Sequence, residues 1–348
     1  MRTLLVGFAS ALLLVGCAAG AARMSKVDAL MHAYDGAVPG ASVLVVRDGV
    51  PIVRRGYGFA DLEAHRAATP RTNYRLASVT KQFTAACILL LAGDGRLGLD
   101  DRVRHWLPGL PAAADTITIR HLLTHTGGLI DYEDIMPPGR TTQLRDADVL
   151  HLLESQDRLY FAPGSRYRYS NGGYALLALI VEKASGESFQ AFLRQRIFVP
   201  LGMRDTLAYV KQGPPVPDRA YGYTGTHGTW TRTDQSLTSA VLGDGGIYSS
   251  IDDLAKWDAA LYDDRLLGEE SRRLAFTPWT KTDDPAVGYG FGWRITGETL
   301  WHSGESIGFR NVIVRWPQRH LTVIVLTNRN EPEPYRIALA IGREFPAH

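Results

Sequence analysis

The stretch WHSGESIGFRNVIVRW, Trp301 to Trp316, decides between two folds. Within it, GESIG matches Gly-x-Ser-x-Gly, the motif of a sharp turn that lifts a nucleophilic serine, here Ser306, above a sheet. Such a turn leads from a strand into a helix. The residues from Phe309 onward are instead apolar and β-branched, which predicts a second strand. We therefore predict a β-hairpin, in which Gly304 and Gly308 lie where the strand and its turn approach other backbone.

The rest of the chain also argues against an α/β-hydrolase, in which an acid and then a histidine follow the nucleophile. No aspartate follows Ser306. The remaining glutamates would have to act with His348, at a chain end that is expected to fray. Another serine is therefore sought as the nucleophile, and the segment that begins at His302 becomes a candidate wall of its site.

Strands are predicted at both ends of the chain. The stretch 41–61 holds two apolar runs joined by Asp48-Gly49, which is a strong hairpin signal. Four more runs near the C-terminus have the composition of strands, namely Tyr289–Ile295, Thr299–Ser303, Asn311–Trp316 and Leu321–Thr327.

The middle of the chain is predicted to be mainly helical. This pattern indicates an α+β fold, in which strands from both termini form one antiparallel sheet, flanked by helices, with a helical region inserted. We expect a single domain over 41–348, with an α/β part at 41–77 and about 240–348, a helical part at about 78–239, and a loose segment at 18–40. The expected helices are Thr80–Leu91, Ile119–Leu123, Gln143–Leu153, Tyr174–Lys183, Phe189–Phe198 and Asp252–Leu261.

The first residues, MRTLLVGFASALLLVGCAAG, carry one basic residue and then an apolar run that is too short to span a membrane. We predict a signal peptide over 1–17. The tetrapeptide LVGC, which ends at Cys17, resembles a bacterial lipoprotein box, whose cysteine bears the lipid after cleavage. An ordinary signal cut near Ala18 to Ala22 is the alternative. Both predict export, and the first predicts a periplasmic or cell-surface protein that is lipid-anchored to a membrane.

Composition excludes several functions. Cys87 is the only cysteine beyond the predicted signal, so an intramolecular disulfide is excluded if Cys17 is removed or lipidated, and the core must hold the fold. Without Arg2 the chain carries 37 basic and 36 acidic residues and no basic tract. Nucleic acids and acidic membrane surfaces are therefore not expected as partners, and no cofactor is expected.

A second candidate nucleophile is Ser78, in the stretch SVTK. Lys81 follows three residues later, which puts both side chains on one helix face. Serine needs a base to take its proton, and an amine acts as one only if burial or positive charge lowers its pKa from about 10.4. The helix start would also direct backbone N–H groups at developing negative charge. A serine N-cap followed by a solvated lysine is the alternative.

Tyr169 and Asn171 lie between a Pro-Gly and a Gly-Gly pair, in the stretch FAPGSRYRYSNGGYALLALI. This pattern predicts a tight loop that leads into an apolar helix. The tyrosine could relay protons to a leaving group, and the asparagine amide could contact both the lysine and a substrate carbonyl. A buried tyrosine and an N-cap asparagine would explain the same residues without catalysis.

In chain order, Ser-x-x-Lys, Tyr-x-Asn and His-x-Gly resemble the motifs of the serine β-lactamase and penicillin-binding protein family. The resemblance is to its class C, D-alanyl-D-alanine carboxypeptidase and β-lactamase-like esterase branch, and spans roughly residues 41–327. Two further stretches are similar to that family, HLLTHTGGL from His121 to Leu129 and GDGGIYSSIDDLAKW from Gly243 to Trp257. The resemblance implies a β-lactamase-like catalytic domain.

The resemblance also implies roles for the motif residues. Ser78 would be the acylated nucleophile, and Lys81 its base or proton shuttle. Tyr169 would act as general base and acid, while Asn171 would orient Lys81 and the substrate amide. The oxyanion hole would use the backbone N–H groups of Ser78 and Glu305, and such donors are typically worth about 3 kcal/mol each at the transition state. The cleft would further be lined by His302, Ser303, Gly304 and Arg310.

The third motif departs from most β-lactamases of the family, which have lysine where this chain has His302. A histidine with a pKa of about 6.5 is mostly neutral at pH 7, so its pull on a substrate carboxylate is weaker. Glu305 adds a negative charge, which repels a carboxylate by around 1 kcal/mol or more if its side chain faces the cleft. Arg310 could offset this charge.

Three other patterns are weighed against function. His121 and His125 have a spacing that can bind zinc, but no third ligand is evident, so no metal is expected and a structural role near the cleft is favoured. The segment Lys281-Thr282-Asp283 resembles a third motif but lacks its glycine and is predicted to be a loop. The aromatic residues Tyr221, Tyr223 and Trp230 have two equally good explanations: they form a substrate-facing loop, or they pack in the core or on the surface.

We therefore predict a serine hydrolase that acts through a covalent acyl-enzyme on an ester or amide bond of a small-molecule or peptide substrate. An esterase is the first choice, a D-stereospecific peptidase or carboxypeptidase comes next, and β-lactam hydrolysis is expected to be inefficient. The alternatives are a penicillin-binding or sensor protein acylated once at Ser78 and a true class C β-lactamase. Tyr169 argues against a sensor, because a protein that only binds needs no proton relay. The sequence does not indicate the oligomeric state.

Overall fold

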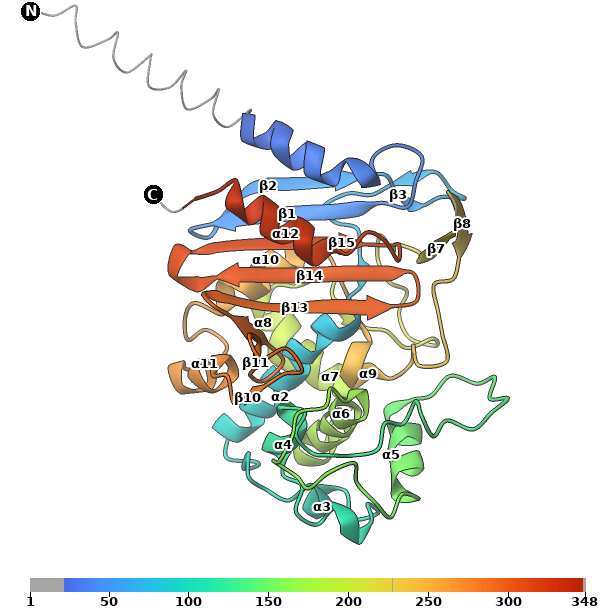
Figure 1. Cartoon of the computed structure of the whole chain (residues 1–348), viewed down its shortest axis with the longest axis vertical. Helices are drawn as coiled ribbons and strands as arrows, with labels where there is room; N and C mark the ends of the chain where they lie inside the picture. Colours follow the sequence, from blue (N-terminus) through green and yellow to red (C-terminus); the bar gives the residue numbers. More distant parts are fainter. Residues whose placement is uncertain (1–21, 227, 347–348) are drawn as a thin grey trace, which may run out of the picture.

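An eight-stranded antiparallel sheet forms the centre of the computed structural model, which describes residues 22–226 and 228–346. Its strand order is β10-β11-β12-β13-β14-β15-β1-β2. Strands from the two ends of the chain are neighbours, because β1 pairs with β15 along its whole length (Figure 1). The prediction of an α+β fold is confirmed. The strands are β1 Ala41–Arg47, β2 Val50–Tyr57, β10 Thr280–Lys281, β11 Gly288–Tyr289, β12 Arg294–Thr296, β13 Thr299–Ser306, β14 Phe309–Trp316 and β15 Leu321–Thr327.

Each face of the sheet is covered by its own hydrophobic cluster, because alternate residues of a strand point to opposite faces. In β1, Val43 and Val45 pack in the cluster that includes Ala338 and Ile341 of α12 (Pro334–Arg343). Leu44 of the same strand belongs to the larger cluster formed with the helices of the inserted region. The sheet therefore lies between α12 on one side and the helical region on the other.

The helical region lies between β2 and β10 in the chain. Four of its helices both begin and end within three residues of their predicted bounds, and α4 matches its prediction at both ends. The helices are α2 Thr80–Gly93, α3 Val103–Trp106, α4 Ile119–Leu123, α5 Asp146–Glu154, α6 Asn171–Ser185, α7 Phe189–Leu193, α8 Val199–Leu201, α9 Leu242–Gly245, α10 Ile251–Ala260 and α11 Glu269–Phe276; a π-helical turn, Arg194–Phe198, follows α7.

Short strands and 3-10 turns connect these elements. β5 and β9 pair with each other, and β9 also pairs with β6, in a small sheet beside the helical region. The short strands are β3 Phe59–Asp61, β4 Arg66–Ala67, β5 Tyr74–Arg75, β6 Leu207–Ala208, β7 Tyr223–Thr226, β8 Thr229–Arg232 and β9 Ile247–Ser249, and the 3-10 turns are His32–Tyr34, Ala77–Val79 (η2), Ala112–Ala114 and Pro317–Arg319.

The segment before the sheet differs from the loose stretch that we expected at 18–40. Residues 22–31 form a helix, and Val27, Met31 and Tyr34 are fully buried. They join the same cluster as α12, so this segment helps to cover the sheet. Cys17 and the predicted signal lie outside the described residues. Within the described part of the chain, none of the helices has the length and apolar character needed to cross a membrane.

The predicted strand Tyr289–Ile295 is wrong in one respect, because it is divided into β11 and β12 by a turn. Gly292 in this turn has a φ of +77°, a left-handed conformation that glycine adopts without strain. A Cβ atom there would lie 2.7 Å from the backbone oxygen of Lys81. The chain therefore turns where it must pass directly against α2.

The Gly-x-Ser-x-Gly motif forms the hairpin between β13 and β14, as predicted, and a strand follows Ser306 where a nucleophile elbow needs a helix. Gly304 faces the upstream serine, because a Cβ atom there would lie 2.0 Å from the backbone oxygen of Leu76 and 3.3 Å from the backbone nitrogen of Ser78. A Cβ atom on Gly308 would lie 2.6 Å from the backbone of Gly222. Both glycines therefore allow the close approaches that the sequence predicted.

Candidate active site

Ser78 lies in the single 3-10 turn η2, between β5 and the start of α2. Ala77, directly before it, has a φ of +49°. This left-handed conformation raises the free energy of any residue that has a side chain. The turn is held from both sides, because Gly304 of β13 and Gly245 of α9 each pack against it. The neighbouring elements therefore fix the strained backbone at Ser78 and leave its side chain partly accessible.

Lys81 is completely buried and its ammonium group makes three hydrogen bonds. Its Nζ atom donates to Ser78 Oγ at 3.1 Å, to Asn171 Oδ1 at 2.8 Å and to the backbone oxygen of Asp244 at 2.9 Å. Burial lowers the pKa of Lys81 to about 8, although the carboxylates of Asp244 and Glu133 act in the opposite direction. A substantial fraction of the amine is thus neutral near pH 8 and able to take a proton.

Asn171 is the first residue of α6, and the helix begins there because the Ser170 hydroxyl accepts a hydrogen bond from the backbone N–H of Gly173 at 3.1 Å. Ser170, not Asn171, is therefore the N-cap. The asparagine is left free to use its side chain elsewhere. Its Oδ1 atom accepts from Lys81, and its Nδ2 atom donates to Glu133 Oε1 at 3.1 Å.

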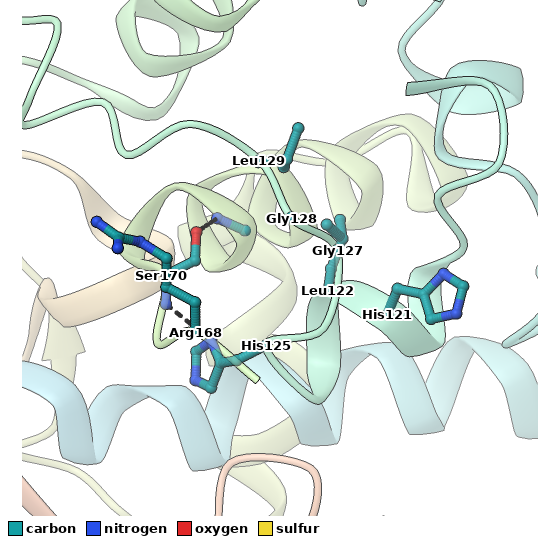
Figure 2. A pocket seen from close by; sticks show the side chains of 9 residues that line it. His121, Leu122, His125, Gly127, Gly128, Leu129, Arg168 and Ser170 are labelled. Carbon is teal, nitrogen blue, oxygen red and sulfur yellow. Dashed lines mark hydrogen bonds between the residues drawn. The ribbon is translucent and has the colours of Figure 1, made fainter. Parts of the chain in front are cut away.

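His125 holds the loop that carries Tyr169. The backbone N–H of Arg168 donates to the backbone oxygen of His125 at 2.9 Å, and that of Ser170 donates to His125 Nδ1 at 3.1 Å. The His125 ring also packs on the Tyr169 ring, with the centroids 4.3 Å apart. Figure 2 shows His125 beside Arg168 and Ser170, around a cavity of about 10 Å³. A volume this small leaves room for about one water molecule, so the loop is closely packed.

The Tyr169 hydroxyl points into the interior without a hydrogen-bond partner among the described residues. Burial raises its pKa well above the ordinary value, while the Ser78 hydroxyl and the Arg294 guanidinium lower it in part. The phenol is therefore protonated at neutral pH. Of the two candidate bases, Lys81 is the one that can start by accepting a proton.

His302 is buried on β13 and is neutral. Its Nδ1 atom lies 2.6 Å from the backbone oxygen of Ser303, so this nitrogen carries the proton and donates it. Its Nε2 atom then accepts from the Tyr289 hydroxyl at 3.0 Å. Burial and the charges of Arg294 and Lys81 bring its pKa well below the ordinary value. His302 thus provides no positive charge for a substrate carboxylate.

Glu305 and Arg310 face each other across the β13–β14 ladder and form an ion pair of 2.6 Å, with 69% of the Glu305 side chain exposed. The repulsion expected from Glu305 is therefore offset by Arg310. The backbone of β13 at Gly304 runs beside the Ser78 amide, so the strand that carries Glu305 passes next to the nucleophile. The pair borders a depression of about 360 Å³ at the strand end.

Three charged residues at the site were not singled out from the sequence. Asp244 is buried beside Lys81, and its carboxylate accepts from the Tyr132 hydroxyl at 3.3 Å. Glu133 contacts Asn171. Arg294 of β12 extends over the rings of Trp301 and Tyr169, with centroid distances of 5.4 and 5.8 Å. Only Asp244 carried a signal, because it lies in the family-like stretch that begins at Gly243.

The other sequence patterns have structural explanations. His121 accepts a hydrogen bond from the backbone of Thr118 at the start of α4, and no group of three metal-ligating side chains occurs among the described residues. The segment Lys281-Thr282-Asp283 was predicted to be a loop. Its first residue, Lys281, belongs instead to the two-residue edge strand β10. Tyr223 is fully buried in the β7–β8 hairpin, which favours packing for this part of the aromatic cluster.

The geometry agrees with comparisons to known proteins. The family model described as Beta-lactamase matches residues 25–344. The chain belongs to the β-lactamase family. It is 33% identical to Penicillin-binding protein 4* of Bacillus subtilis (strain 168), over 90% of this chain and 72% of that protein. It is also 33% identical to a D-aminopeptidase of Brucella canis, over 88% of this chain but only 60% of that longer protein.

A solved structure extends the comparison to esterases. EstCE1, described as a hydrolase with promiscuous acyltransferase activity, superposes with a TM-score of 0.80 at 25% identity and covers 95% of this chain and 99% of its own. The chain is thus a serine hydrolase of the β-lactamase family, related to penicillin-binding proteins, D-aminopeptidases and an esterase.

Proposed function

We propose that the protein cleaves an ester or amide bond of a small acyl substrate through a covalent intermediate at Ser78. The observation that carries this proposal is the buried Lys81 amine, which lies 3.1 Å from Ser78 Oγ and has a pKa lowered to about 8. A serine hydroxyl becomes a useful nucleophile when a neighbouring base of suitable pKa removes its proton.

The reaction follows from the positions of these groups. Neutral Lys81 accepts the Ser78 proton as Oγ forms a bond to the acyl carbon, and the backbone N–H groups of Ser78 and Glu305 stabilise the oxyanion. The protonated Tyr169 then gives its proton to the leaving group as the scissile bond breaks, and Lys81 restores it. Water enters for deacylation, with the same groups acting in reverse order.

The subtype is supported by the relatives and by the charges of the cleft. Relatives named as a D-aminopeptidase and as a hydrolase with acyltransferase activity favour amino acyl amides and simple esters as substrates. His302 is neutral, which favours inefficient β-lactam hydrolysis. The Nε atom of Arg294 has no hydrogen-bond partner among the described residues. Its positive charge was not singled out from the sequence, and it favours short peptides with a carboxylate as further substrates.

The direct test is turnover of p-nitrophenyl propanoate by the soluble domain. We expect multiple turnovers by the wild type, and a loss of at least about 10³-fold in kcat for Ser78→Ala. Ser306→Ala is the matched control, because it removes the hydroxyl of the Gly-x-Ser-x-Gly motif, and it should retain activity. An active Ser78→Ala variant, or a dead Ser306→Ala variant that is folded, would refute the proposal.

Penicillin distinguishes the subtypes. We expect an adduct on Ser78, detected by intact mass, to form slowly and to turn over inefficiently. Fast multiple turnover would contradict the hydrolase proposed here and favour a true class C β-lactamase. If every substrate acylates Ser78 once and the acyl group is not released, the result would favour a sensor protein.

We also propose that the protein is exported from a bacterial cytoplasm and tethered to a membrane by a lipid on Cys17. The supports for this proposal are the short apolar run of the first residues and the Leu-Val-Gly-Cys stretch.

A further inference from the structure

The amide of Asn171 has a fixed orientation in the site. The Lys81 Nζ atom donates to the amide oxygen of Asn171 at 2.8 Å, and the carboxylate on the other side of the amide can only accept. The amide nitrogen therefore points to the other side, where it donates to Glu133 Oε1 at 3.1 Å. Three successive hydrogen bonds thus connect Ser78, Lys81, Asn171 and Glu133.

Glu133 brings an uncompensated negative charge to this end of the site. The described residues form no ion pair with its carboxylate, whereas the neighbouring Asp134 lies 3.7 Å from Arg168. The charge acts on the catalytic groups, because it raises the pKa of Lys81, of Asp131 and of Asp244. Glu133 is exposed, so a bound substrate can reach it.

Arg294 places the opposite charge beside Tyr169. It lies over Tyr169, the proposed proton donor to the leaving group, and it lowers the pKa of Lys81, whereas Glu133 raises it. Asn171 is predicted to contact the substrate amide and Tyr169 to serve the leaving group. With these roles, a substrate attached to Ser78 has the Glu133 carboxylate, which contacts Asn171, near its acyl group. The Arg294 cation, which lies over Tyr169, is then near the leaving group. An ammonium on the acyl group would gain a charge-assisted hydrogen bond at Glu133. An acylamino carbonyl would meet a carboxylate instead.

We propose that Glu133 is the specificity-determining residue for the acyl group, and that it selects substrates with a free α-ammonium over the same substrates with an acylated amine. This rests on the proposed function, since it assumes acylation at Ser78. The substrate class is then an ester, amide or short peptide whose cleaved acyl group is an unblocked amino acid.

The test compares D-alanine p-nitroanilide with N-acetyl-D-alanine p-nitroanilide at pH 7, where the α-ammonium is largely protonated. We expect the wild type to prefer the free amine in kcat/KM, and Glu133→Gln to reduce this preference by about tenfold, the range of a hydrogen bond to a charged group. Glu133→Lys should reduce it further. Because Glu133 also affects the pKa of Lys81, the ratio of the two substrates is measured, in which that shared effect cancels.

Asp134→Asn is the matched control, because it removes one negative charge from the same loop at a residue that contacts Arg168 and not Asn171, and its ratio should equal that of the wild type. A wild type that prefers the N-acetyl substrate, or a Glu133→Gln ratio that does not change, would overturn the subsite. In either case, loss of p-nitrophenyl propanoate turnover in Ser78→Ala would still uphold the proposed function. Activity in Ser78→Ala would instead refute that function.

Discussion

Lys81 is subject to opposing electrostatic effects. Burial lowers its pKa to about 8, and the positive charge of Arg294 acts in the same direction, while the carboxylates of Asp244, Glu133 and Asp131 raise it. Asp244 is the largest of the three. Its own pKa is raised to about 6, so it is mostly ionised at neutral pH. Asp244 therefore sets how much neutral Lys81 is available at a given pH.

Replacing Asp244 by Asn should consequently shift the pH profile. The substitution removes the negative charge and keeps an oxygen to accept from Tyr132. The pKa of Lys81 should fall further, so neutral amine appears at lower pH. We expect the ascending limb of kcat/KM for p-nitrophenyl propanoate, near pH 8 in the wild type, to move to lower pH by about one unit.

The control for this profile is Asp134→Asn, which removes a charge of the same sign that is not among the main charges acting on Lys81. Its ascending limb should coincide with that of the wild type. An Asp244→Asn limb that stays in place or moves to higher pH would show that Asp244 does not control Lys81.

At the scale of residues, the sequence predicted contacts between residues that are close together in the chain. Ser78 and Lys81 are three residues apart, and helix geometry alone brings them together. Asp244 contacts Lys81 from 163 residues away, and Glu133 and Arg294 likewise come from separate elements. No spacing rule gives such contacts, because they depend on how the helical region packs against the sheet.

At the scale of elements, a buried ion pair joins the sheet to α10. Arg315 of β14 lies 2.5 Å from Asp258 of α10, and their side chains are 1% and 3% exposed. Thr322 of β15 also donates to this carboxylate at 2.8 Å. The arginine would therefore be left as an uncompensated buried charge if the aspartate were removed.

Asp258→Ala should lower the free energy of unfolding by about 3–5 kcal/mol, measured by urea denaturation. The comparison is Glu298→Ala, which breaks the more exposed pair between Arg319 and Glu298, 3.4 Å apart, and should cost at most about 1 kcal/mol. Equal losses in the two variants would contradict the importance of burial here.

Elements with a clear periodicity were predicted well, and those shaped by distant contacts were not. β15 has its predicted bounds, because its seven residues are all buried and apolar or β-branched. The break between β11 and β12 escaped prediction, because it arises where Gly292 passes against α2. The helix at 22–31 was missed although its apolar residues have helical spacing, and their packing against the sheet is seen only in the folded chain; these residues are Met24, Val27, Leu30 and Met31.

At the scale of the whole molecule, the chain is anchored at one end if Cys17 bears a lipid. The described part of the chain has no helix able to cross a membrane. A single acyl chain binds membranes only weakly, whereas several chains on one residue give stable anchoring. A Cys17 that bears several acyl chains should therefore place the enzyme in the membrane fraction at any ionic strength.

Cys17→Ala tests this expectation in cell fractionation of the full chain. We expect the wild type to pellet with membranes, to resist extraction by high salt and to be released by detergent. The variant should be soluble or retained with an uncleaved signal. Cys87→Ala is the matched control, since it removes the buried cysteine of the domain and should leave the distribution unchanged. If the wild type is soluble, or if Cys17→Ala still pellets after its signal is removed, the tether does not exist and an ordinary secretory signal explains the same residues.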